Sequence, residues 1–137
     1  MNTKLNFTQS IKAGAFAAIT AAVINALLFF VFHSAGVLVD TIFIQPETPL
    51  TIVPVLFSSI LPSLVASIVF FLFEKYSANG FKFFSIVAVV LLLLSFINPF
   101  VGIKDVTIGY AIVLNVMHVV VAAAVLYFIN RAKKAIN

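Results

Sequence analysis

The run Val87-Ala88-Val89-Val90-Leu91-Leu92-Leu93-Leu94 contains no polar side chain, so a helix built from it is apolar on every face. It belongs to a longer apolar segment that extends from about residue 81 to about residue 101. A helix of about 20 residues crosses a bilayer core of roughly 30 Å. The segment therefore predicts a transmembrane helix, and the lack of a polar face predicts broad contact with lipid.

Three further segments of the same kind occupy most of the remaining chain. Short polar breaks separate the four predicted spans, which lie at about 11–33, 51–73, 81–101 and 108–130. The first is longer than the apolar region of a signal peptide, which has about 7–15 residues, so we interpret it as a retained span. These segments predict an all-α fold, a four-helix transmembrane bundle that forms one integral membrane domain over residues 1–137.

Composition restricts where a functional site can lie. Hydrophobic residues make up 64% of the chain and charged residues 9%, whereas a soluble domain carries about 25% charged residues. Any site must therefore lie between the helices or in an outer loop. The absence of cysteine excludes disulfides, thiolate metal sites and dithiol redox chemistry.

Basic residues gather on one side of the predicted bundle. They are Lys4, Lys12, Lys75, Lys82, Arg131, Lys133 and Lys134. Lys104 falls on the other side, where Asp40, Glu47 and Asp105 also lie. Because basic loops are retained in the cytoplasm, we predict an N-in/C-in multi-pass protein of a bacterial inner membrane. Topology and contact with anionic lipid explain the net charge of +4, and no nucleic-acid partner is required.

The longest break between spans, residues 34–50, is itself largely apolar. Residues 37–44 are mostly β-branched or apolar, and the following Gln45-Pro46-Glu47-Thr48-Pro49 is a turn signal. The segment is predicted to form a flap or short hairpin over the outer ends of the helices; a segment lying on the lipid headgroups is the alternative. In the flap, Phe43 and either Leu38 or Val39 would pack onto the helices. The flap would then control access from the outer leaflet by roofing a polar layer that holds Asn25, Ser58, Ser95 and Asn115.

Polar side chains recur at similar depth in all four predicted spans, roughly 9–15 Å below the outer surface at a rise of about 1.5 Å per residue. Pro62 also leaves the Ser58 carbonyl without its helical donor in this layer. The candidate ligand-binding residues are Asn25, Ser58, Ser59, Ser95, Asn98, Asn115 and His118, of which Asn98 lies nearest the surface. Because Asn115 and His118 share a helical face and polar groups avoid lipid, His118 is expected to point into the bundle.

Two interpretations of this polar layer remain open from the sequence. In one, the side chains hydrogen-bond to each other and fix the register of the helices. In the other, they line an outward-opening pocket for a small amphiphile.

Catalytic and metal chemistry find little support. The predicted spans contain no Asp or Glu, although a proton-coupled transporter usually needs one. A hydrolase needs a nucleophile, a base and an orienting group in contact; Ser58 or Ser59 with His118 is conceivable, but no nucleophile motif surrounds either serine. His33 and His118 differ in depth by more than about 10 Å, which argues against joint ligation of haem or metal. We therefore predict no catalytic residue, no metal site and no cofactor.

Several short patterns resemble a known bacterial family of small four-span membrane proteins, which is classified as a domain of unknown function. They are Asn25 followed by Gly36-Val37, the Pro-containing second span, the leucine run leading into Ser95-x-x-Asn98-Pro99, and Met117-His118-Val119-Val120 with Ala122-Ala123. The resemblance covers nearly the whole chain. It implies a four-helix bundle and transfers no activity and no catalytic residue.

The sequence thus favours a non-enzymatic membrane protein that binds a lipid or another hydrophobic small molecule in an outer-leaflet pocket. The alternative is a structural or accessory subunit of a larger membrane complex, and a lipid-modifying enzyme ranks third. The expected partners are membrane lipids, with a membrane-protein partner or a second copy of the chain as further candidates.

Overall fold

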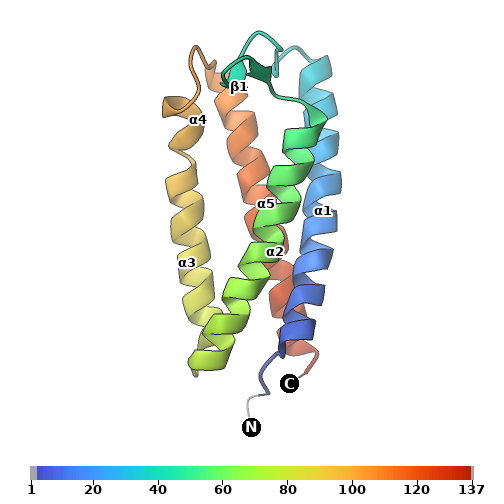
Figure 1. Ribbon diagram of the computed structural model, residues 1–137, viewed down its shortest axis with the longest axis vertical. Helices are drawn as coiled ribbons and strands as arrows, with labels where there is room; N and C mark the ends of the chain where they lie inside the picture. Colours follow the sequence, from blue (N-terminus) through green and yellow to red (C-terminus); the bar gives the residue numbers. More distant parts are fainter. Residues whose placement is uncertain (1–2, 137) are drawn as a thin grey trace.

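The computed structural model describes residues 3–136 and shows a bundle of long helices with a small hairpin at one end (Figure 1). The elements are α1 (Phe7–Ser34), β1 (Phe43–Gln45), β2 (Thr48–Pro49), α2 (Ile52–Tyr76), α3 (Gly80–Ser95), α4 (Asn98–Val101) and α5 (Ile108–Lys134). In the described part of the chain, α1, α2, the α3–α4 segment and α5 are each long and apolar enough to cross a membrane. The predicted four-helix transmembrane fold is confirmed.

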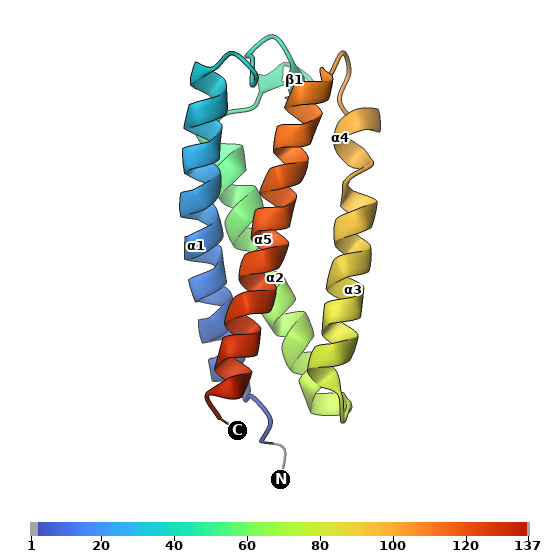
Figure 2. The same ribbon diagram turned by 180° about the vertical axis from the view of Figure 1, so that it is seen from behind.

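The described ends of the chain lie together at one end of the bundle, which we call the termini end, and the opposite end is the hairpin end (Figures 1 and 2). Helix α2 runs diagonally, beside α1 at the hairpin end and beside α3 at the termini end. Within α3 only Gly80 and Phe84 are buried. The third span is thus the least packed helix, as its uniformly apolar sequence predicts.

Small residues form the interface between α1 and α2. Helix α2 places Ser59, Ser63 and Ser67 on one fully buried stripe, four residues apart. Each hydroxyl donates to a backbone carbonyl of its own helix, so no hydroxyl donor is left unpaired in the interface. Opposite them, a Cβ added to Gly14 would lie 2.5 Å from the Cβ of Ser67. The two backbones therefore approach as closely as glycine allows.

A buried ion pair lies at the termini end of the bundle. Glu74 is 1% exposed, and its two carboxylate oxygens accept hydrogen bonds from Lys133 Nζ at 2.8 and 3.0 Å. The expectation that no acidic residue lies within a spanning helix is wrong, because α2 continues to Tyr76, three residues beyond the predicted span. The pair joins the last turn of α2 to the last turn of α5.

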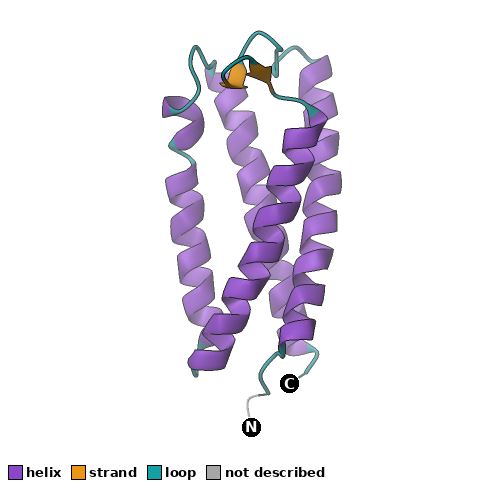
Figure 3. Cartoon of the chain, in the orientation of Figure 1, coloured by secondary structure: helices purple, strands orange, loops and turns teal. Residues whose placement is uncertain are grey.

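The hairpin end is covered by an ordered segment. β1 pairs with β2 in antiparallel fashion, with Phe43 opposite Pro49, and Figure 3 shows this hairpin above the helix ends. Leu38, Ile42 and Leu50 are buried in a cluster with side chains of α1, α2 and α5. The predicted hairpin-like flap is confirmed, and Leu38 packs as expected. Phe43 does not: it is 47% exposed, and the preceding residue, Ile42, takes the inward position at 5% exposed.

Candidate functional site

Asn25 and Ser59 belong to a packed hydrogen-bond network. Asn25 Nδ2 donates to Ser59 Oγ at 2.9 Å and to the backbone carbonyl of Met117 at 3.2 Å. Ser59 Oγ in turn donates to the carbonyl of Val55 at 2.8 Å. Asn25 is 2% exposed, so these contacts join α1, α2 and α5 without opening onto a cavity. For these two residues the geometry matches the network interpretation.

Asn115 and Asn98 lie at the connection between α3 and α5. Asn115 Nδ2 donates to the carbonyl of Phe96 at 3.2 Å, which joins α5 to the turn before α4. Asn98 is exposed, and its backbone carbonyl accepts from the amide of Gly102 at 2.7 Å. Neither asparagine lines the cavity described next, so the structure separates them from the other candidates.

Ser58, Ser95 and His118 are brought together by a crevice of about 340 Å³ between α2, α3 and α5. Because α2 and α3 meet at the termini end and diverge toward the hairpin end (Figures 1 and 2), the crevice lies between two helices that splay apart, with α5 completing its wall. Apart from these three side chains its lining is apolar, with Pro62, Val65, Ala66, Val69, Phe84, Val87, Ala88, Leu91, Leu92, Val121, Ala122 and Val125.

Polar atoms in the crevice are few and only partly paired. Ser58 Oγ donates to the Val55 carbonyl and Ser95 Oγ to the Leu92 carbonyl, which leaves each hydroxyl oxygen as an acceptor. His118 Nδ1 is buried without a hydrogen-bond partner among residues 3–136. An unpaired buried polar atom is unfavourable by about 1–3 kcal/mol. A ligand that carries one hydroxyl, amine or carbonyl group would remove this penalty, whichever tautomer His118 adopts.

The lining offers contacts for binding rather than an assembled catalytic group. Neither crevice serine is hydrogen-bonded to His118, and no carboxylate lines the crevice. Within the described residues, no three His, Asp or Glu side chains lie close enough to hold a metal ion. The groups that remain can orient one polar atom of an otherwise apolar molecule.

The hairpin segment does not cover this crevice. None of residues 34–50 lines it, so the expectation that the flap roofs the whole polar layer is wrong. The flap instead packs over the cluster that contains Met117, whose carbonyl accepts from Asn25. The physical reason is that α3 stands apart from the three helices on which the flap rests.

Sequence reasoning missed two features near these residues. The serine stripe on α2 was visible as a spacing of four, which places residues on one helical face. The pairing of Glu74 with Lys133 carried no local signal, because the two residues are 59 positions apart.

Four spans packed in this way define a multi-pass integral membrane protein. Residues 6–135 match the profile of DUF6069, a family of unknown function, and the chain belongs to that family. The resemblance to a family of unknown function that covers nearly the whole chain is thereby confirmed. Comparison with curated proteins gives no match, and comparison with solved structures gives none.

Proposed function

We propose that this protein binds a membrane lipid or another hydrophobic small molecule in the crevice between α2, α3 and α5, without chemical conversion of that molecule. The observation that carries the proposal is the unpaired Nδ1 of His118 in a cavity whose lining is otherwise apolar except for Ser58 and Ser95. A volume of about 340 Å³ lies within the usual range for ligand pockets, about 300–1,000 Å³. The distribution of basic residues supports an orientation with both termini in the cytoplasm, and the location that we propose is a bacterial inner membrane.

The lining also indicates the kind of ligand. Ser58 and Ser95 lie toward the hairpin end, whereas Phe84 lies near the termini end of α3, so the crevice runs along the bundle axis. An elongated apolar chain fits this direction. Its polar group would lie beside His118, with the serine oxygens and the Ser58 carbonyl freed by Pro62 as further acceptors. The proposed ligand is therefore an amphiphile with one small hydrogen-bonding group.

Bound-lipid mass spectrometry of the gently purified protein tests this proposal with a matched pair of variants. Ala122 lines the crevice and the neighbouring Ala123 faces outward. Ala122→Phe should fill the crevice and remove a specifically retained molecule, whereas Ala123→Phe should retain it. His118→Leu should reduce retention while the protein stays folded, because the polar contact is lost and the volume is preserved.

Three results would contradict the proposal. They are a wild-type protein that carries only bulk lipid, equal retention in both alanine variants, and a His118→Leu protein that keeps the molecule.

The accessory-subunit function is the second candidate, and the exposure of α3 favours it. With only Gly80 and Phe84 buried, α3 presents most of its apolar surface outward. A helix of a larger membrane protein would cover such a surface. The same purification discriminates the two functions: a stoichiometric protein partner without a retained small molecule supports the subunit function.

A further inference from the structure

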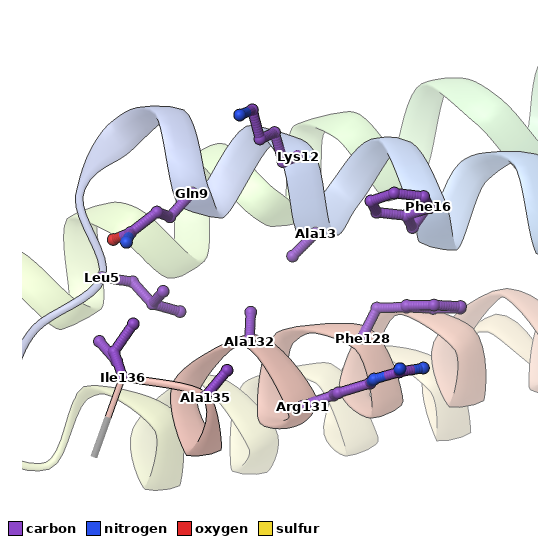
Figure 4. Close-up of a pocket in the computed structure, with 10 residues that line it drawn as sticks. All are labelled: Leu5, Gln9, Lys12, Ala13, Phe16, Phe128, Arg131, Ala132, Ala135 and Ile136. Atoms are coloured by element: carbon purple, nitrogen blue, oxygen red, sulfur yellow. The ribbon is translucent and has the colours of Figure 1, made fainter.

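A second cavity lies at the termini end of the bundle and shares no lining residue with the crevice. It is a groove of about 460 Å³ between the first turns of α1 and the last turns of α5. Figure 4 shows its lining side chains, which include Gln9, Lys12 and Phe16 from α1 and Phe128, Arg131 and Ala132 from α5. None of these residues lines the crevice of the proposed function.

The groove has an apolar part and a basic part. Phe16 and Phe128 face each other across the gap between the helices (Figure 4), with ring centroids 6.0 Å apart and planes at 19°. Phe16 is 58% exposed, so the rings are accessible from the surrounding membrane. Ala13 and Ala132 leave room between the helices because their side chains are short. This part presents apolar surface to an extended hydrocarbon chain.

The basic residues of the groove lie nearer the ends of the chain. Gln9 precedes Phe16 by seven residues, and Lys12 precedes it by four, or roughly 6 Å along the helix axis. On α5, Arg131 follows Phe128 by three residues, but its side chain extends back along the helix beside Phe128, and the Lys12 side chain extends away from α5 (Figure 4). Both side chains are long, so their charged ends can turn to the membrane surface while their apolar stems line the groove. A phospholipid has a charged phosphate at the surface and acyl chains below, so it would meet the cations and the aromatic rings in that order.

The two cations have no counter-charge within the described chain. Among residues 3–136, neither Lys12 nor Arg131 forms an ion pair, whereas Lys133 nearby is neutralised by Glu74. Glu74 is the only acidic residue at this end of the described structure, and both of its carboxylate oxygens already accept from Lys133. The positive charge beside the groove is thus available to an external anion.

We propose that this groove binds an anionic phospholipid from the leaflet at the termini end. Arg131 and Lys12 contact the phosphate, and one acyl chain lies against Phe16 and Phe128. A guanidinium binds phosphate oxygens through two parallel hydrogen bonds, and lysine adds a point charge. The basic residues predict that this leaflet is the cytoplasmic one, where anionic lipid attracts basic side chains.

Native mass spectrometry during titration with phosphatidylglycerol tests the assignment, with phosphatidylcholine as the zwitterionic comparison. The test protein carries Lys12→Gln and Arg131→Gln. Its control carries Lys82→Gln and Lys134→Gln, which remove the same charge from exposed positions outside the groove. We expect wild-type protein to bind phosphatidylglycerol more tightly than phosphatidylcholine. The test protein should lose about tenfold or more in phosphatidylglycerol affinity, and the control should change much less.

Each other outcome overturns the assignment. Equal weakening in both variants would mean diffuse surface charge, and no weakening would exclude Lys12 and Arg131 as phosphate contacts. Glycerophosphate that competes as well as intact lipid would show a site for a free phosphate without a chain-binding part. A dimer that disappears in the test protein would identify a second copy of the chain as the occupant. Thermal unfolding of all variants confirms that the compared proteins are folded.

Discussion

Asn25 shows how one buried amide can organise three helices. Its two donor hydrogens reach a side chain of α2 and a backbone carbonyl of α5, so the helices are fixed in rotation as well as in position. In lipid, such hydrogen bonds stabilise by about 0.6 kcal/mol on average and up to about 1.7 kcal/mol. The contribution is modest, but each hydrogen bond forms only in one register. Asn25 is therefore better explained as a registry residue than as a ligand contact.

A double-mutant cycle with Asn25→Leu and Ser59→Ala measures this role. Asn25→Leu keeps the branching and the number of side-chain heavy atoms and removes both hydrogen bonds, and we expect it to destabilise the bundle by about 1–2 kcal/mol. The coupling energy with Ser59→Ala should fall at about 0.6–1.7 kcal/mol, measured by unfolding in mixed micelles. A coupling near zero would contradict the direct contact between the two side chains.

The polar residues were correctly identified from the sequence, but their sorting was not predictable. Depth along a helix follows from counting residues, so a shared layer could be inferred. Whether a side chain faces a packed interface or a cavity depends on how each helix is rotated and tilted. Asn25 and Ser59 face a packed interface. Ser58 and His118 lie in the same layer but face the crevice. The diagonal course of α2, which opens the crevice, has no counterpart in the hydrophobic pattern.

At the scale of the helices, the α1–α2 interface depends on the absence of side-chain bulk. A Cβ at position 14 would meet both the Cβ and the Oγ of Ser67 at 2.5 Å, and the Ser63 carbonyl at 3.2 Å. Backbone atoms on the far side leave little room for relaxation. The close approach lets the serine stripe pack directly against α1.

Gly14→Ala should therefore destabilise the protein by about 1–3 kcal/mol, the usual effect of overpacking. In contrast, alanine is favoured over glycine in helices by about 1 kcal/mol, so Gly109→Ala on α5 is a suitable control. Its added Cβ would meet only Val37 Cγ1, at 3.4 Å. In thermal unfolding, Gly14→Ala should unfold at a lower temperature than wild type, and Gly109→Ala should unfold at the same temperature or a higher one. Partial rescue of Gly14→Ala by Ser67→Gly would locate the clash, and a neutral Gly14→Ala would refute it.

The helices are longer than the apolar runs that predict them. Hydropathy marks the part of a helix that lies in hydrocarbon, whereas backbone hydrogen bonding continues through the interface. Helix α1 begins at Phe7 because Asn6 caps it: Asn6 Oδ1 accepts from the Gln9 amide, and Gln9 Oε1 accepts from the Asn6 amide. The last turn of α2 likewise carries Glu74 beyond its predicted span. These interfacial turns contain the ion pair and the basic groove, which explains why the sequence did not reveal either.

Over the whole molecule, packing is uneven. Helices α1, α2 and α5 form the core together with the hairpin segment, and α3 is attached mainly through its buried first turns. A Cβ at Gly80 would lie 2.5 Å from Glu74 Cα, so the α2–α3 turn is tight and leaves α3 little freedom at the termini end. Farther along, α3 diverges and the crevice opens. The fold thus combines a closely packed three-helix core with one helix that buries few of its side chains.

The charge distribution predicts the orientation of this molecule in its membrane, and exposed residues at the two ends of the bundle allow a test of that orientation. Seven basic residues lie at the termini end or in its connecting turn, which predicts a cytoplasmic location for that end.

Thr48 in the hairpin and Asn79 before α3 are both exposed, at opposite ends of the bundle. Because the chain has no cysteine, a single Cys at either position is the only thiol. Thr48→Cys should react with an impermeant maleimide in intact spheroplasts, and Asn79→Cys should react only after permeabilisation. Equal labelling of both variants in permeabilised cells is the control for accessibility. The reverse pattern in intact spheroplasts would invert the topology and would move the basic groove, with its anionic lipid, to the outer leaflet.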